Sequence, residues 1–227
     1  MRLAKRYETK TEIYGQQINH YVAKYVESGT RILDVGCGIG KLGEHLGKYA
    51  GCSVAGVDIS KVAIGQAAEV LDEAFCLDVQ KDKLPFADES FDVIICADVL
   101  EHLFDPLEVL RTLKAYLRHQ GYFLLCIPNV ANIKIRCNLL LGKFDYKETG
   151  ILDNTHVRFF TRKTVQDLVS DAGLSIKQID YMPGFSFLLL QDQYVEKLEL
   201  LRRIRYCLMR LWPTLFCNRF VIVAEKK

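Results

Sequence analysis

The sequence lacks several features that would place it in a class at once. None of its eight cysteines forms a C-x-x-C pair, so neither a zinc site nor a redox pair is supported, and we expect no metal ion. Basic and acidic residues nearly balance, 30 against 28, and this gives no sign of nucleic-acid binding. No apolar run approaches the ~20 residues that span a bilayer, and the amino terminus lacks the apolar segment of a secretory signal.

These absences favour a protein of the cytoplasm with reduced thiols. Several cysteines lie in apolar runs, where a free thiol behaves as a small hydrophobic side chain. A chain of 227 residues suits one large domain or two small ones.

Short apolar runs alternate with helical segments along the first half of the chain. The runs cover residues 31–35, 53–58, 73–79, 91–97 and 121–127. They are nearly all apolar, which is typical of parallel strands buried on both faces. A further helix is predicted to run to about Arg118. Asp105 would be its N-cap, Pro106 its first residue and Glu108 the partner in a capping box. The alternation predicts a doubly wound α/β sheet.

Further elements are expected toward the carboxyl end. A helix from about Thr161 ends at Gly173, a residue type suited to the position after a last turn. Residues 174–181 and 219–225 are predicted strands. Residues 194–212 carry apolar side chains at steps of three and four, which predicts an amphipathic helix. Its basic residues leave open a membrane-surface contact, a dimer contact or a plain solvated face.

Three glycines, Gly36, Gly38 and Gly40, follow the first predicted strand. A glycine turn there lets a ligand approach the backbone at the carboxyl edge of the sheet. Asp58 ends the second predicted strand, where an acid typically accepts hydrogen bonds from ribose hydroxyls. The dinucleotide pattern G-x-G-x-x-G is not matched, because Lys41 occupies the place of its third glycine. Acids at positions 34, 58 and 78 would disfavour pyrophosphate and suit a cation such as a sulfonium.

Five ordered motifs resemble those of class I S-adenosylmethionine-dependent methyltransferases. They are ILDVGCGIGKLG, VAGVDIS, CLDV, LPFADESFDVIICADVLEHLFDP and LRHQGYFLLCIPN, within residues 31–129. The resemblance implies S-adenosylmethionine as cofactor and a seven-stranded, mostly parallel sheet of order 3-2-1-4-5-7-6, with strand 7 antiparallel and helices on both faces. The family's Pro-Gly-Gly turn is reduced to Gly121, which lies away from the cofactor.

The matched positions imply a set of cofactor-binding residues at the ends of the strands. Those expected around the methionine part are Asp34, Gly36, Cys37, Gly38, Gly40, Cys96 and Ala97. Those expected around the nucleoside are Asp58 for the ribose hydroxyls, Ile59 and Val79 beside adenine, and Asp78 for its amino group.

The block of residues 127–174 resembles a narrower group, the methyltransferases encoded among the glycosyltransferases of bacterial surface-polysaccharide pathways. The pattern GxFDY…GxLDxTHxRFFT carries this resemblance. It implies O-methylation of a sugar hydroxyl in a glycan or its precursor. Ubiquinone-type O-methyltransferases have similar second halves, so a quinone or other small metabolite stays open as the acceptor. A non-catalytic cofactor-binding or scaffold protein is a further alternative, and a dinucleotide oxidoreductase is the outsider.

An alcohol acceptor calls for a general base, and His156 is the first candidate, followed by His102. Arg158 is expected to orient an acidic or phosphorylated acceptor. Structural roles compete with these. His156 would pin its loop by a hydrogen bond. Asp98 and Glu101 form D-x-x-E, which predicts either a helix cap with His102 as its partner or a direct contact with substrate.

We expect one methyltransferase domain over residues 1–227, with an amino-terminal helical cap (1–30) and a cofactor-binding half (31–127). Segments 128–160 and 183–217 would be acceptor-side insertions. Tyr7 and Tyr14 are candidates for a lid or for plain packing.

Overall fold

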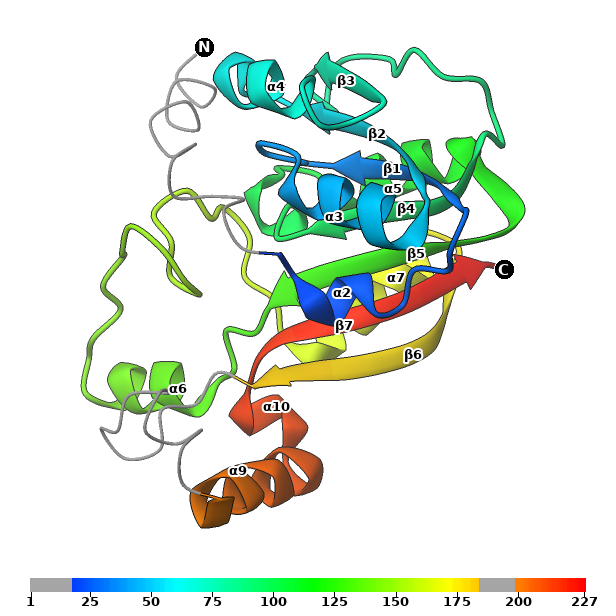
Figure 1. Cartoon of the computed structure of the whole chain (residues 1–227). Helices are drawn as coiled ribbons and strands as arrows, with labels where there is room; N and C mark the ends of the chain where they lie inside the picture. The colour runs from blue at the N-terminus through cyan, green and yellow to red at the C-terminus, as the bar shows by residue number, and fades with distance from the viewer. Residues whose placement is uncertain (1–17, 184–198) are drawn as a thin grey trace.

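A central sheet with helices on both faces dominates the computed structural model, which describes residues 18–183 and 199–227 (Figure 1). The strands are β1 (Arg31–Val35), β2 (Ser53–Asp58), β3 (Glu73–Cys76), β4 (Phe91–Ala97), β5 (Leu117–Pro128), β6 (Leu174–Pro183) and β7 (Cys217–Lys226). The helices are α2 (His20–Ala23), α3 (Lys41–Ala50), α4 (Lys61–Ala67), the 3₁₀ helix η1 (Leu100–His102), α5 (Pro106–Tyr116), α6 (Ile133–Leu140), α7 (Arg162–Asp171), α9 (Glu199–Leu211) and α10 (Pro213–Phe216).

The seven strands follow the order β3-β2-β1-β4-β5-β7-β6. Strands β1 to β5 pair in parallel, whereas β7 runs antiparallel to both β5 and β6. The predicted fold class is therefore confirmed, including the antiparallel seventh strand. The parallel strands end at one edge, and in this fold type ligands bind in loops beyond that edge.

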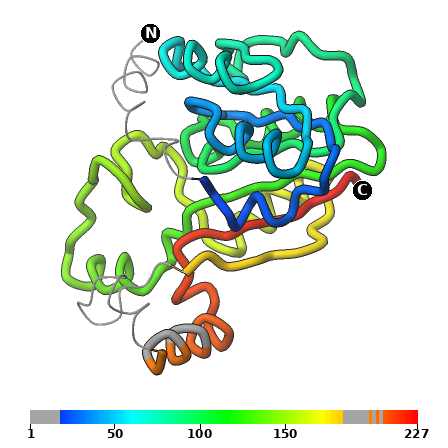
Figure 2. The backbone as a smooth tube through the Cα atoms, viewed as in Figure 1, coloured from blue at the N-terminus to red at the C-terminus, as the bar shows by residue number. Residues whose placement is uncertain are grey.

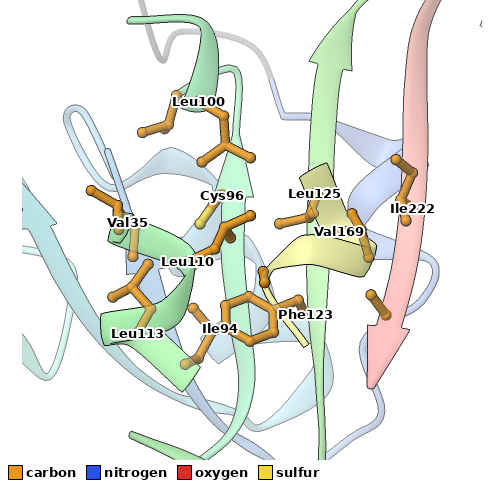
Figure 3. Close-up of a cluster of buried hydrophobic side chains, with 14 of the residues drawn as sticks. Val35, Ile94, Cys96, Leu100, Leu110, Leu113, Phe123, Leu125, Val169 and Ile222 are labelled. Carbon is orange, nitrogen blue, oxygen red and sulfur yellow. The ribbon is translucent and has the colours of Figure 1, made fainter. Parts of the chain in front are cut away.

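Alternate strand residues face two separate layers of core. Leu33 of β1 packs on the side of α5 and α7, whereas its neighbour Ile32 packs on the side of α2 and α3. Figure 3 shows Leu110 and Leu113 of α5 directed at strand β4. Successive side chains of a strand point to opposite faces. Because both faces are covered, the central parts of β1, β2 and β4 are mostly apolar.

Helix α5 begins where the sequence predicts. Asp105 Oδ1 accepts a hydrogen bond from the Glu108 N–H at 3.1 Å, and Pro106 is the first helical residue. The prediction that Glu108 completes a capping box is wrong, because α5 shows only this first of the two bonds. The helix also ends two residues before Arg118, since Leu117 already pairs with β4.

The reciprocal capping box occurs instead at α7, between Thr161 and Thr164. Gly173 follows that helix with a φ of +72°, as its predicted place after the last turn requires. Strand β3 ends at Cys76, three residues before the predicted boundary, so Asp78 lies in a turn.

The predicted helix 194–212 is described from Glu199 to Leu211 as α9, and its first residues lie outside the described part of the chain, as do Tyr7 and Tyr14. No helix among the described residues is both long and apolar enough to cross a membrane. All eight cysteines are free; five of them are buried, and Cys76, Cys137 and Cys207 are exposed.

Candidate active site

The glycine turn after β1 has a backbone that other residues adopt only with strain. Gly36, Gly38 and Gly40 have φ angles of +71°, +53° and +80°, all in the left-handed region. A Cβ atom on Gly36 would also come closer to Val99 Cγ2 than real Cβ contacts allow. The turn is fastened to β2, because the N–H groups of Gly36 and Cys37 both donate to the Val57 carbonyl oxygen, at 2.7 and 3.1 Å.

Asp58 lies at the end of β2 and joins this turn to the next loop. Its Oδ2 accepts from the Gly38 N–H at 3.0 Å, and its Oδ1 accepts from the Ser60 N–H at 2.8 Å. Burial raises the pKa of Asp58, and these backbone hydrogen bonds oppose the rise. The expected ribose-binding carboxylate therefore lies directly beside the glycine turn.

Asp34, the penultimate residue of β1, is 3% exposed. Burial, followed by repulsion from Asp58, raises the pKa of Asp34 to about 7. A nearby cation would favour the ionised carboxylate and lower that pKa again. Two neighbouring carboxylates with raised pKa values are thus suited to a positively charged ligand, and such groups concentrate at functional sites.

The residues expected beside adenine lie at the ends of β2 and β3. The Leu77 N–H donates to the Asp58 carbonyl oxygen at 2.9 Å and so ties the two strand ends together. Asp78 accepts from the Gln80 N–H at 3.1 Å and forms an ion pair with Lys81. Ile59, directly after β2, and Val79, in the turn after β3, are half-buried.

The two cysteines expected near the methionine part are buried thiols. Cys37 is 6% exposed and Cys96 is fully buried. Burial raises the pKa of both thiols, with a further contribution from the Asp34 charge. They are therefore inert rather than reactive groups. Ala97, at the end of β4, is half-buried.

The residues after β4 do not form the predicted helix cap. Val99 is the N-cap of η1, and no side chain caps it. Asp98, with a left-handed φ of +56°, instead accepts from Arg219 Nε at 2.6 Å. Glu101 is 1% exposed, and within residues 18–183 and 199–227 neither of its carboxylate oxygens has a hydrogen-bond partner.

The loop that carries His156 is held against η1. The N–H groups of Val157 and Arg158 both donate to the Glu101 carbonyl oxygen, at 2.9 and 3.0 Å. The rings of His102 and His156 consequently meet edge to face, with their centroids 4.7 Å apart. His156 Nε2 lies 3.8 Å from Glu101 Oε1. Burial lowers the pKa of His156, which favours its neutral ring.

Arg158 points away from this cluster. It is exposed, and its Nε donates to the Phe104 carbonyl oxygen at 3.1 Å. The structure therefore brings together two of the three predicted catalytic residues and adds Glu101. The D-x-x-E-H pattern of residues 98–102 carries a signal for Glu101, because it predicts either a helix cap or a contact with substrate, and the structure shows no cap.

The segment after β5 leaves the sheet at the edge where the parallel strands end (Figure 2). In this segment the Phe144 ring meets the rings of Tyr146 and Phe159 edge to face, and Tyr146 is exposed. The centroid of the Phe159 ring lies 6.4 Å from that of the His156 ring. The amide side chains of Asn129 and Asn132 both donate to the Cys217 carbonyl oxygen, so they are structural.

Residues 7–179 match the protein family described as a methyltransferase domain, which is more than half of the chain. The chain belongs to this family and is a methyltransferase. S-adenosylmethionine is the cofactor that membership implies.

Two curated relatives carry the same name, ubiquinone biosynthesis O-methyltransferase. The protein of Haemophilus ducreyi is 32% identical over 177 residues, which cover 73% of this chain and 72% of that protein. The protein of Aeromonas salmonicida is 28% identical over 172 residues, which cover 73% and 70%. A methyltransferase structure from Archaeoglobus fulgidus shares the fold, with a TM-score of 0.66, 21% identity and coverage of 95% and 94% of the two chains.

Proposed function

We propose that the protein transfers the methyl group of S-adenosylmethionine to a hydroxyl of a quinone precursor or a similar small ring-shaped metabolite. The observation that carries the proposal is the junction of Asp58 with the glycine turn, beside the buried Asp34. This junction offers a carboxylate for ribose hydroxyls and a side-chain-free backbone for the rest of the donor. Two acids with raised pKa values suit its cationic sulfonium and amino group.

We assign the donor to the residues that the sequence pattern selected. Gly36, Gly38 and Gly40, with Cys37, Cys96, Ala97 and Asp34, would surround its methionine part. Asp58 would accept the ribose hydroxyls. Ile59 and Val79 would flank adenine, and Asp78 would accept from its amino group.

The acceptor is proposed to bind on the segment after β5. Phe144, Tyr146 and Phe159 offer aromatic faces to a flat ring, next to the His156 ring. The names of the two relatives support a quinone-type acceptor better than the sugar hydroxyl that the sequence first favoured. A sugar hydroxyl is the second candidate, because the exposed Asp145 and Lys147 in the same segment suit a hydroxylated ligand.

The chemistry requires alignment above all. The sulfonium methyl group is already electrophilic, and holding an acceptor oxygen in line with the carbon–sulfur bond can supply roughly 7–11 kcal/mol. Removing the hydroxyl proton adds a factor of about 10²–10⁴. The cluster of Glu101, His102 and His156 is our candidate for assisting that step.

Calorimetry of the purified chain with S-adenosylmethionine, its demethylated product and NADH tests the donor. We expect the first two to bind and NADH to fail; binding of NADH alone would refute the proposal. Labelled S-adenosylmethionine with separate panels of phenols, dihydroxybenzenes and nucleotide sugars then tests the acceptor. Label in a ring hydroxyl supports our assignment, whereas label in a sugar shifts it to the second candidate. Donor binding with no transfer to any acceptor would favour a scaffold protein.

A further inference from the structure

We propose that Gln80 and Arg158 are positioning residues that link the donor side of the site to the acceptor side. Their side chains bind the backbone of one residue, Phe104, from two segments of the chain. The Phe104 N–H donates to Gln80 Oε1 at 2.8 Å, and Arg158 Nε and Nη2 both donate to the Phe104 carbonyl oxygen, at 3.1 and 2.5 Å. These three residues are called the backbone clasp below. The inference rests on the proposed function, which assigns adenine to the turn of Gln80 and the acceptor to the loop of Arg158.

Phe104 lies in the short connection between η1 and α5. Leu103 follows η1 directly, and Asp105 is the N-cap of α5. Leu103 is buried and anchors one end of the connection, whereas the Phe104 ring is 56% exposed and contributes little burial. Exposed backbone with few buried contacts opens easily. The position of the Phe104 backbone therefore depends on its two hydrogen-bonded partners.

Gln80 belongs to a closed turn that carries the carboxylate expected to bind adenine. Asp78 Oδ1 accepts from the Gln80 N–H at 3.1 Å. The Asp78 carbonyl oxygen accepts from the N–H groups of Lys81 and Asp82, both at 2.8 Å, and Asp82 Oδ2 accepts from the Asp78 N–H at 2.8 Å. Because its two ends are bonded to each other, this turn moves as one piece. A donor that is held by Asp78 would therefore also fix the side chain of Gln80, and through it the clasp.

Arg158 belongs to the loop that presents His156 and Phe159 to the proposed acceptor. The main-chain N–H groups of Val157 and Arg158 already donate to the Glu101 carbonyl oxygen. The Arg158 side chain adds a further attachment, to the connection that follows η1. The planar guanidinium directs two N–H groups at one oxygen, which fixes its orientation more narrowly than a lysine ammonium group would. Arg158 thus holds the acceptor loop and does not itself bind an anionic acceptor.

The backbone clasp predicts that donor binding orders the acceptor loop. A donor that immobilises the turn of Gln80 removes part of the freedom that the loop would otherwise lose when the acceptor binds. Such ordering couples two sites without a large movement of the backbone. One hydrogen bond of this kind shifts an equilibrium by about two- to tenfold. We expect the coupling between donor and loop to have this size.

Hydrogen exchange of the full chain, followed by mass spectrometry, tests the link without knowledge of the acceptor. The amides to follow are those of residues 151–160. In the ligand-free chain we expect Gln80→Ala to speed exchange there at least about twofold, although position 80 lies outside that segment. Gln80→Glu keeps an oxygen that accepts from the Phe104 N–H, so its exchange should resemble that of the unaltered chain. Saturating S-adenosylmethionine should slow exchange of residues 151–160 in the unaltered chain and in Gln80→Glu, but not in Gln80→Ala.

Arg111 provides the matched control for Arg158. Its Nη2 donates to the Asp171 carbonyl oxygen at 3.0 Å, so it also joins two distant segments at an exposed position. These segments are α5 and the end of α7, which belong to neither side of the proposed site. Arg111→Gln and Arg158→Gln should therefore lower stability toward urea to a similar extent. Only Arg158→Gln should speed exchange of residues 151–160 and remove the effect of S-adenosylmethionine on it.

Two results would overturn the inference. One is unchanged exchange of residues 151–160 in ligand-free Gln80→Ala, and the other is an equal effect of S-adenosylmethionine in Gln80→Ala and the unaltered chain. Should Gln80→Ala unfold by circular dichroism, Arg158→Gln decides, because it should speed exchange of residues 78–82 from the other end of the clasp. A chain that binds no S-adenosylmethionine by calorimetry refutes the proposed function, whereas the ligand-free comparison still decides whether the clasp joins the two segments.

Discussion

Replacing Gly36 with alanine separates the two reasons for a glycine in the turn. The φ of +71° costs an alanine about 1–2 kcal/mol. Its Cβ would also come closer to Val99 Cγ2 than the 3.0 Å below which something must shift, and such overpacking typically costs about 1–3 kcal/mol. We therefore expect Gly36→Ala to lower the free energy of unfolding by about 2–5 kcal/mol, a large share of the total for a domain.

Gly29 provides the matched control. Its φ of +76° is nearly the same, but a Cβ there meets no heavy atom within 4 Å. Gly29→Ala should therefore show only the backbone cost of about 1–2 kcal/mol. Adding Val99→Ala to Gly36→Ala should recover the steric part, which a double-mutant cycle measures as a coupling of about 1–3 kcal/mol.

Urea unfolding, with the slope m checked for constancy, provides the assay. Two results would refute the reasoning. One is a Gly36→Ala chain no less stable than Gly29→Ala, and the other is a cycle with no coupling between positions 36 and 99. Either would mean that the turn moves away from Val99 at little cost.

Three further predictions concern single side chains. Asp58→Ala should weaken S-adenosylmethionine binding about a hundredfold by calorimetry, because two hydrogen bonds to a charged group are lost; unchanged affinity would contradict the ribose assignment. Since the pKa of Asp34 is about 7 in the fold and 3.8 ordinarily, the ligand-free chain should lose stability as pH rises through this window, by up to about 1.4 kcal/mol per pH unit. In Asp34→Asn the free energy of unfolding, measured with urea at several pH values, should not show this fall. An equal dependence on pH in both chains would contradict the role assigned to Asp34. Thr161→Ala should cost about 1 kcal/mol in the same assay, through loss of the capping box with Thr164; a loss below ~0.3 kcal/mol would show that the cap contributes little.

The sheet could be predicted because its signal is local. Strands β1, β2 and β4 have the predicted bounds, since burial on both faces leaves a short apolar run with polar neighbours. The predicted end of β3 is wrong by three residues. This edge strand pairs on one side only and is less buried, so its boundary depends on pairing with β2.

The candidate site was predicted only where its partners are close in the pattern. Asp58 and the glycine turn follow consecutive strands, and their contact follows from the fold class. Of the two roles predicted for Asp98 and Glu101, the helix cap is wrong, because D-x-x-E predicts a cap only where no distant group competes. The competing groups are Arg219, 121 positions from Asp98, and the loop of His156. A local pattern carries no information about either.

Val99 connects the two parts of the site. It lies between Asp98 and η1 and packs so closely on Gly36 that the turn has no room for a side chain there. The glycine is therefore required by the segment after β4 as well as by any ligand that approaches the turn. A shift of η1, which carries Glu101 and His102, would press on the backbone beside Asp58. The donor side and the histidine cluster are thus packed as one unit, so a substitution at position 99 should disturb both donor binding and the packing of the histidine cluster.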